Sequence, residues 1–278
     1  MSIYGRAANR VRVIAAGLFI CGAVTSASYA STPDGTLGRE PDAKREQVSA
    51  VTNSSEDFLG DVNRDDVVQH LKESLTSEAI QNFGLFVYVN KSGTGPHAQR
   101  MYVFEKTEGG ELALRYDWPV STGRERLETD AHGHLQSTAT PQGFYQLDPA
   151  RLYSEHVSGQ WDEPMPYAMF FNWAPNGRKT GLAIHGTSEE ESRLLGTPAS
   201  AGCVRLSQDN ARTLFDLVRT QFRSPVVPKL AYLDGETNVS SRGTFLHDRD
   251  GRLQVQDGYS VLVAIDEYDG ESQTTAQR

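Results

Sequence analysis

Hydrophobic positions recur at two different spacings along the chain, and the spacing changes near residue 84. Before this point they fall on one face of a helix, which predicts a single amphipathic helix over residues 63–81; the positions are Val67, Leu71, Leu75 and Ile80. After it, short runs of β-branched and aromatic residues are separated by turns rich in Asn, Gly and Ser. Such runs predict a β-meander, with strands at residues 85–89, 101–104 and 112–116.

The later segments extend this mainly β pattern and add one clear helix. Residues 208–222 carry a continuous apolar stripe and follow Ser207, a favourable N-cap residue, so a helix is expected there. Residues 122–139 are polar and are expected to form a loop, whereas residues 223–257 contain Pro, Gly and Asp and are expected to form an extended excursion. Further strands are expected after the turn at residues 140–145 and at residues 165–173, 181–186 and 259–265.

The first 30 residues have the pattern of a secretory signal peptide. Three arginines precede a short apolar run that cannot span a bilayer, and Ser28-Tyr29-Ala30 suits a cleavage site. An uncleaved anchor and a lipoprotein acylated at Cys21 are the alternatives, and the bulky residues before Cys21 argue against the second. The expected organisation is a signal peptide at 1–30, a flexible tail plus a short amphipathic helix at 31–83, a main domain at 84–266 with an insertion at 223–257, and a polar tail at 267–278.

Composition places the chain among globular proteins. Of its 278 residues, 38% are hydrophobic and 23% are charged, which excludes a mostly disordered chain, a collagen-like repeat and a disulfide scaffold. The net charge is −9, and loss of the first 30 residues, with three arginines and no acidic residue, would make it −12. A nucleic-acid partner is therefore not expected, because such proteins carry positive charge along the phosphate backbone.

Signal cleavage would leave Cys203 as the one cysteine of the mature chain. Such a thiol is either reactive or buried and inert, and the count does not decide between the two. A cysteine nucleophile needs a base, commonly a histidine, and N–H donors for the developing oxyanion. His185 ends an apolar strand and precedes a glycine, so it is expected at a sheet end facing a cleft. Gly202 leaves the backbone beside the thiol uncovered, which would let a substrate carbonyl approach the N–H groups there.

These residues belong to a longer ordered pattern. His185-Gly186 is followed after 14 residues by Ser200-x-Gly202-Cys203-Val204-Arg205, which resembles the signature of the L,D-transpeptidase catalytic domain, the YkuD type. Four other segments also resemble blocks of this family: Pro119–Gly123, Thr140–Tyr145, Met165–Tyr167 and Leu195–Ala199. The resemblance covers roughly residues 84–222 and the strand at 259–265.

The resemblance implies a fold and a reaction. The fold would be mainly β, sandwich- or barrel-like, with a helix after the cysteine strand and an N-terminal helix. The protein would be a peptidoglycan L,D-transpeptidase in the periplasm or cell wall of a bacterium, acting on stem peptides without a metal or organic cofactor. The acyl acceptor would be a stem diaminopimelate, a lysine of an envelope protein or a D-amino acid. Carbapenems, which acylate many family members, would be inhibitors.

The resemblance also assigns roles to individual residues. Cys203 would be the nucleophile and His185 the base, with the backbone carbonyl of Gly186 orienting the imidazole and the backbone at Gly202 on the oxyanion side. Residues expected to contact substrate are Arg205, Tyr167, Ser200 and Thr187.

One position departs from the family pattern. Ala201 stands two residues before the cysteine, where the family usually has histidine. Residues i and i+2 of an extended segment share a face, so this position is expected beside the thiol. The departure motivates two alternatives: a cysteine hydrolase of the same fold, which trims stems or releases wall-linked protein, and a catalytically silent wall-binding module.

Two other features admit a binding interpretation. His132 and His134 would give a metal site two ligands, but a third ligand is not evident and no metal is expected. The tryptophans are expected in the core or in a cleft wall rather than in a carbohydrate platform; they are Trp118, Trp161 and Trp173.

Overall fold

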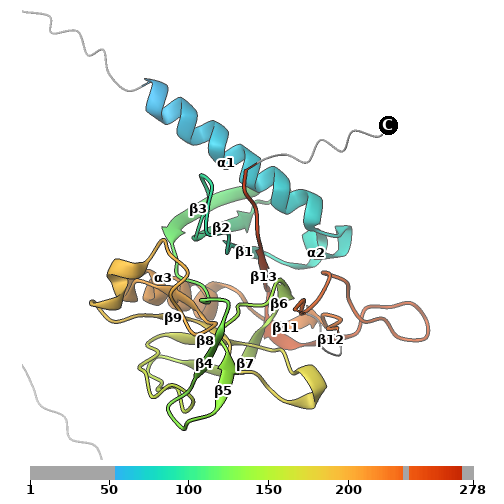
Figure 1. Ribbon diagram of the computed structural model, residues 1–278. Coiled ribbons are helices and arrows are strands. Elements are labelled where there is room, and N and C mark those ends of the chain that lie inside the picture. The colour runs from blue at the N-terminus through green and yellow to red at the C-terminus, as the bar shows by residue number, and fades with distance from the viewer. Residues whose placement is uncertain (1–53, 234–237, 271–278) are drawn as a thin grey trace, which may run out of the picture. The chain divides into compact units, whose positions relative to one another are not determined.

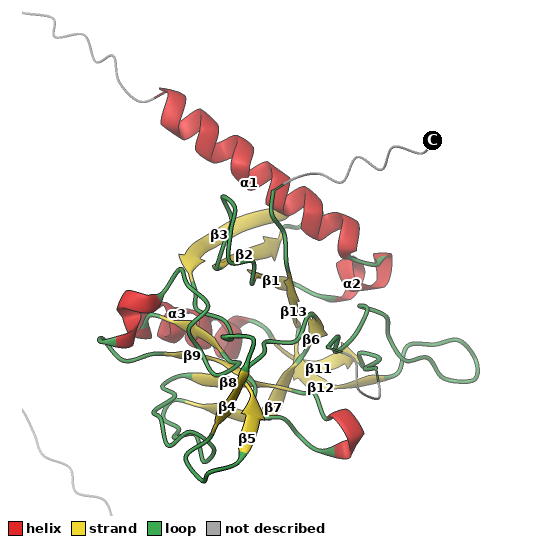
Figure 2. Cartoon of the chain, viewed as in Figure 1, coloured by secondary structure: helices red, strands yellow, loops and turns green. Residues whose placement is uncertain are grey.

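The computed structural model describes residues 54–233 and 238–270, where strands predominate over helices (Figure 2). The expected signal peptide and most of the two expected tails lie outside these residues. The helices are α1 (Ser54–Ser74), α2 (Ser77–Asn82) and α3 (Gln208–Gln221), with short 3-10 turns η1 (Pro175–Gly177) and η2 (Glu191–Leu194). The strands are β1 (Leu85–Asn90), β2 (Arg100–Lys106), β3 (Leu112–Pro119), β4 (Leu127–Thr129), β5 (Leu135–Ser137), β6 (Gly143–Tyr145), β7 (Leu147–Tyr153), β8 (Ala168–Phe171), β9 (Ala183–Gly186), β10 (Val204–Leu206), β11 (Arg223–Pro228), β12 (Val255–Tyr259) and β13 (Val261–Asp266).

The first sheet has five strands in the order β3-β2-β1-β13-β6 (Figure 1). The expected meander forms its β1–β3 part, and the last strand of the chain, β13, inserts parallel to β1. Every residue of β1 is buried, because the sheet is covered on both faces. This explains why the run Leu85–Val89 is continuously apolar rather than alternating.

The second sheet has four strands in the order β10-β9-β8-β7. One hydrophobic core joins the two sheets, and its members come from β1 and β13 on one side and from β8, β9 and β10 on the other; they include Val87, Val263, Met169, Ile184 and Val204. Two sheets packed over a shared core form a sandwich. The expectation of a mainly β fold is confirmed.

Helix α3 begins one residue after its predicted N-cap. The Ser207 hydroxyl accepts a hydrogen bond from the Asn210 N–H at 3.2 Å. The apolar stripe of the helix is buried in the shared core, and includes Leu214, Phe215 and Val218. The predicted helix after the cysteine strand is therefore confirmed.

The outer face of the first sheet is covered by α1 and α2, which correct the prediction of a single helix over residues 63–81. Their apolar residues Val67, Leu71 and Ala79 pack with β1 and β2 side chains. Helical structure is interrupted between α1 and α2, where the Thr76 hydroxyl caps α2 by accepting the Ala79 N–H at 3.2 Å. Helix α1 also begins at residue 54, inside the segment expected to be a flexible tail.

Two segments expected to lack regular structure contain strands. Residues 122–139 include the hairpin β4–β5, in which Leu127 pairs with Ser137 and Thr129 with Leu135. The excursion at 223–257 starts and ends in a two-stranded sheet, β11–β12. Between these strands it contributes Leu230 and Phe245 to the core beneath α1 and α2.

Candidate active site

The pairing of β9 with β10 places the candidate catalytic residues on one face of the second sheet. The strands are parallel, with Ile184 opposite Val204 and His185 opposite Arg205. Ile184 and Val204 are buried in the shared core. Side chains alternate across a strand, so His185, Arg205 and Cys203, two residues before Arg205, share the other face. The imidazole thus comes from β9, and the thiol from the bend immediately before the adjacent β10.

The orientation of the His185 ring is fixed by the chain itself. Its Nδ1 lies 2.7 Å from the carbonyl oxygen of Gly186, and the side chain is buried. A carbonyl oxygen accepts, so Nδ1 carries the proton and Nε2 has the free lone pair. The Gly186 N–H in turn donates to the Pro166 carbonyl at 2.8 Å. This geometry matches the role that the resemblance implied for Gly186.

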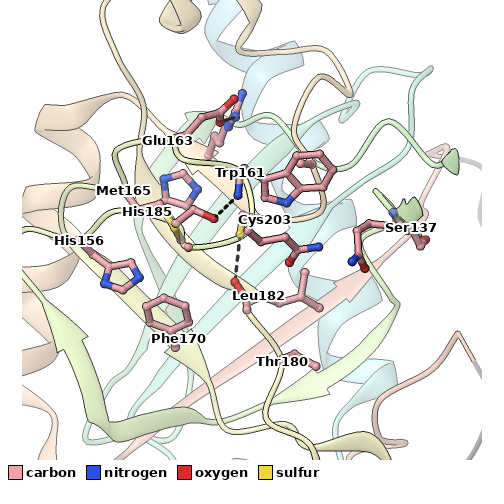
Figure 3. A pocket seen from close by; sticks show the side chains of 18 of the residues that line it. Ser137, His156, Trp161, Glu163, Met165, Phe170, Thr180, Leu182, His185 and Cys203 are labelled. Atoms are coloured by element: carbon pink, nitrogen blue, oxygen red, sulfur yellow. Dashed lines mark hydrogen bonds and ion pairs between the residues drawn. The ribbon is translucent and has the colours of Figure 1, made fainter. Parts of the chain in front are cut away.

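Cys203 and His185 line the same cavity, whose volume is about 530 Å³ (Figure 3). The Cys203 thiol donates to the Gly181 carbonyl oxygen at 3.5 Å, a weak contact that leaves the sulfur lone pairs accessible. Ala201 also lines this cavity, as expected from its spacing to the thiol. The other walls come from the β4–β5 hairpin, from residues 156–165 and from residues 179–182.

Burial shifts the pKa values of His185 and Cys203 in opposite directions. It lowers the pKa of His185 to about 4, and the Arg205 charge contributes in the same direction. It raises the pKa of the Cys203 thiol to about 11. Both groups disfavour their charged forms, so the resting pair is a neutral thiol beside a neutral imidazole.

The turn before the thiol depends on Gly202 and Ser200. The Gly202 N–H donates to Ser200 Oγ at 3.0 Å, so it is engaged within the turn rather than presented to an oxyanion. Ser200 is fully buried, and its hydroxyl donates to the Cys203 carbonyl at 2.5 Å. Gly202 has φ +115°, and a Cβ there would lie 2.9 Å from the Ala139 carbonyl oxygen. Glycine is therefore required by the turn.

Two segments that come earlier in the chain, residues 119–123 and 140–145, hydrogen-bond to this turn. Thr140 Oγ1 donates to the Gly202 carbonyl at 2.7 Å and accepts the Gly123 N–H at 2.8 Å. The Ser200 N–H donates to the Thr122 carbonyl at 2.8 Å. The segments around residues 119–123 and 140–145 thus position the cysteine, a role their sequence did not reveal. The ordered spacing of the blocks was the signal that linked them.

Arg205 and Thr187 belong to an ion-pair network rather than to a free substrate-binding surface. The Arg205 guanidinium is 6% exposed and donates to Glu191 at 2.7 Å and to Glu163 at 2.5 Å. The Thr187 hydroxyl donates to the second oxygen of Glu191 at 2.6 Å. Arg205 lines the cavity, but both of its terminal nitrogens are occupied, so it positions the two loops that carry these glutamates. Sequence analysis missed Glu163 and Glu191.

Tyr167, for which the resemblance implied a substrate contact, is not among the residues that line this cavity. Its backbone has a positive φ of 56°, and its ring packs edge-on against Phe215 of α3, with centroids 5.7 Å apart. Trp161 is the tryptophan in the cavity wall, whereas Trp118 and Trp173 pack with the shared core. The expected division of tryptophans between core and cleft wall is therefore confirmed.

His132 and His134 lie in the turn of the β4–β5 hairpin. His132 Nε2 is 2.6 Å from the Gly159 carbonyl oxygen, and His134 Nδ1 is 3.7 Å from an Asp130 carboxylate oxygen. Within residues 54–233 and 238–270, no group of three or more His, Cys, Asp and Glu side chains is arranged to hold a metal ion. In the same part of the chain, no helix is both long and apolar enough to cross a membrane.

The family model of the L,D-transpeptidase catalytic domain (YkuD) matches residues 86–228. No curated protein matches the chain. Similar solved structures include an L,D-transpeptidase from Mycobacterium smegmatis, with 14% identity and a TM-score of 0.35 over 66% of this chain and 59% of that one. Another is an L,D-transpeptidase from Stackebrandtia nassauensis, with 17% identity and a TM-score of 0.35 over 68% and 58%. The helical cell shape determining protein Pgp2 from Campylobacter jejuni has 17% identity and a TM-score of 0.37 over 67% and 48%.

The chain thus matches between about half and three fifths of the length of these structures. The resemblance seen in the sequence is confirmed by the family model, which spans more than half of the chain and contains the histidine, the cysteine turn and the blocks that hold it. The protein belongs to the family of the L,D-transpeptidase catalytic domain.

Proposed function

We propose that this protein is a peptidoglycan L,D-transpeptidase that works through a cysteine acyl-enzyme. The observation that carries the proposal is the contact of His185 Nδ1 with the Gly186 carbonyl, because it leaves Nε2 as a base in the cavity that also contains Cys203. A base in a fixed tautomer near a thiol is the arrangement that nucleophilic catalysis needs. The reaction requires no metal or organic cofactor.

In the first half-reaction, Cys203 attacks the carbonyl of the third residue of a tetrapeptide stem. His185 Nε2 takes the thiol proton as the S–C bond forms. The imidazolium then gives this proton to the leaving nitrogen, the C–N bond breaks and D-Ala departs. The product is a thioester on Cys203. Because the resting pair is neutral, proton transfer accompanies the attack rather than preceding it.

In the second half-reaction, an amine resolves the thioester. His185 takes a proton from the amine as its nitrogen bonds to the acyl carbon, and the C–S bond breaks to restore the thiol. A second cavity of about 920 Å³ shares His156 and Glu163 with the first, and its lining includes Glu155, Glu189 and Glu191. These four carboxylates outnumber the one Arg205 charge with which Glu163 and Glu191 pair, so negative charge remains at this border and attracts a cationic amine. The amine gives one proton to water before its neutral nitrogen attacks. The acceptor is a stem diaminopimelate, a lysine of an envelope protein or a D-amino acid.

The proposed site of action is the periplasm or cell wall of a bacterium, after export and removal of residues 1–30. The arginines, the apolar run and the cleavage pattern at that end of the sequence support this location. Peptidoglycan stem peptides are the substrate there.

The second candidate function is a cysteine hydrolase, and Ala201 is the observation that favours it. This small side chain lines the cavity with Cys203 where the family usually has an imidazole, so it leaves more room beside the thioester. Water in place of the amine gives a free carboxylate, and the enzyme is then a carboxypeptidase.

Product analysis tests the proposal directly. The protein is incubated with a tetrapeptide stem, with and without an amine acceptor, and the products are identified by mass spectrometry. We expect D-Ala release, a thioester on Cys203 and an amide product that requires the acceptor. Cys203→Ala is the matched control and should form neither product nor carbapenem adduct. Hydrolysis without any amide product would identify the protein as a cysteine hydrolase. A wild-type protein that forms no product would instead be a catalytically silent wall-binding module.

The variant Ala201→His tests whether the alanine at this position adjusts the reaction or abolishes it. The added imidazole narrows the cleft and, when charged, favours the thiolate. We expect an already active wild type and a variant with a changed ratio of transpeptidation to hydrolysis. Turnover by the variant alone would show that the wild-type chain is a degenerate family member.

A further inference from the structure

Two chain segments form much of the cavity wall, and hydrogen bonds join them to each other. One is the hairpin, residues 127–137, which contributes Gln136 and Ser137 to the lining. The other is a loop that we call the arm, residues 156–165, whose lining residues include Gly159, Gln160 and Trp161. Cys203 lies in the cavity that both segments border (Figure 3).

The arm has its own internal hydrogen bonds. Val157 and Pro164 form a β-bridge, and the Ser158 N–H donates to the Glu163 carbonyl at 2.8 Å. At its tip the Asp162 N–H donates to the Ser158 carbonyl at 2.8 Å. Near its base, Glu163 pairs with the buried Arg205. The arm is therefore a preformed element, and its movement requires a hinge at its ends rather than unfolding.

The turn of the hairpin is equally well defined. Asp130 is buried, and one of its carboxylate oxygens accepts the N–H groups of His132 and His134 at 2.9 and 2.8 Å. These bonds fix the backbone of the turn, and the side chains of the two histidines point in different directions from it. His134 lies near Asp130, whereas His132 reaches across to the arm.

Two hydrogen bonds join the hairpin to the arm. His132 Nε2 donates to the Gly159 carbonyl at 2.6 Å, and the Ala131 N–H donates to the Gln160 carbonyl at 3.1 Å. Their acceptors, Gly159 and Gln160, both line the cavity, so the joint lies where the arm borders it. Because His132 is exposed, water can replace its bond at a small cost, so the joint opens more easily than the elements it connects.

We propose that His132 is a specificity-determining residue: its bond to Gly159 closes the rim of the thiol cavity and limits the size of the groups that reach Cys203. Small or extended groups pass the closed rim, and bulky or branched groups require the bridge to open. The consequence for substrate rests on the proposed function: the filter favours an extended stem peptide over a cross-linked one.

Thiol labelling tests the filter without any turnover. The full chain is treated with N-ethylmaleimide or with a maleimide carrying a branched poly(ethylene glycol) group beside its ring, which share one reactive group and differ in bulk. Labelling of Cys203 is followed by mass spectrometry of the digested chain, which distinguishes it from Cys21. The variants are His132→Leu, which removes the donor, His132→Gln, which retains a side-chain N–H, and His134→Leu, the matched control in the same turn.

For His132→Leu we expect the bulky reagent to react about two- to tenfold faster than with wild type, the range for losing one hydrogen bond. The small reagent should react at an unchanged rate, His132→Gln should restore the wild-type ratio, and His134→Leu should leave it unaltered. An unchanged bulky rate, an equal gain for both reagents, or the same effect from His134→Leu would overturn the proposal. Because labelling needs no stem peptide, failure of the transpeptidase proposal remains a separate result.

Discussion

At the residue scale, the chemistry of the site depends on how burial changes the pKa values of Cys203 and His185. The same enclosure raises the pKa of the thiol to about 11 and lowers that of the imidazole to about 4. A thiolate–imidazolium pair is therefore disfavoured at rest, and substrate binding must supply the conditions for proton transfer. The low His185 pKa keeps the base unprotonated over the whole neutral range.

The pH dependence of thiol alkylation checks this account. A thiol reacts as the thiolate, so a pKa near 11 predicts a rate for iodoacetamide that rises about tenfold per pH unit from about pH 7 to 10. No plateau is expected near neutrality. A rate that levels off below about pH 8 would reveal a preformed ion pair and contradict the neutral resting state.

Loss of the base should be costly. We expect His185→Ala to lower the rate of acylation of Cys203 by a stem peptide by about 10²–10⁴-fold, the usual contribution of a positioned base. His156→Ala is the matched control, because His156 lines the same cavity and has no contact that assigns it a catalytic role. A loss below about tenfold at His185, or an equal loss at His156, would assign the base elsewhere.

The sequence pointed to Cys203 and His185 as a candidate pair, but not to the residues whose contacts hold the site around them. Cys203 and His185 were visible because each stands beside glycine in an ordered pattern, whereas the partners of Arg205 lie 14 and 42 residues away and follow no local rule. The resemblance implied a substrate contact for Tyr167, and nothing in the sequence indicated that its ring packs edge-on against Phe215 of α3. Such tertiary contacts have no periodic signal in the chain.

At the element scale, the site depends on the turn at Gly202, immediately before β10. Gly202→Ala should destabilise the fold by about 1–3 kcal/mol, because φ is +115° and the new Cβ would contact the Ala139 carbonyl oxygen. Urea unfolding measures the loss. Gly93→Ala is the control, since a Cβ there meets nothing within 4 Å and its φ is not positive. Equal stability of the two variants would mean that the turn adapts.

Elements with strong periodicity were predicted, and short or interrupted ones were not. The α3 stripe and its Ser207 cap are local features, so its start was read correctly. The α1–α2 break was missed because Leu71, Leu75 and Ile80 keep helical spacing across it; the signal was Thr76, a capping residue. The β4–β5 strands are only three residues each, too short for alternation to show.

At the scale of the whole molecule, the first sheet separates two cores. The site lies beyond the shared core, on the outer face of the second sheet, while α1 and α2 pack on the far side of the first. His70 of α1 connects this helix to the last strand: its Nε2 is 2.8 Å from an Asp266 carboxylate oxygen, and its ring stacks on Tyr268 with centroids 4.2 Å apart. Tyr88 of β1 donates to the other Asp266 oxygen at 2.5 Å.

Docking of α1 should therefore depend on pH. The hydrogen bond to Asp266 raises the pKa of His70 above its ordinary 6.5, against the opposing effect of burial. A group whose pKa is raised by folding contributes stability that is fully present below the unfolded value and is lost as the pH rises through the folded value. The contribution of His70 should thus be larger at about pH 5.5 than at about pH 8.5.

Urea unfolding of wild type and His70→Gln at both pH values measures this contribution. Glutamine can still hydrogen-bond to Asp266 but does not titrate, so the difference in unfolding free energy between the two proteins isolates the charge. We expect that difference to shrink as the pH rises. Groups that titrate alike in both proteins contribute equally to the two unfolding free energies and therefore cancel in the difference. The shift should be modest, because His70 and Asp266 are each about one third exposed and salt screens their attraction. An equal difference at both pH values would show that His70 holds α1 by stacking on Tyr268 and not by its charge.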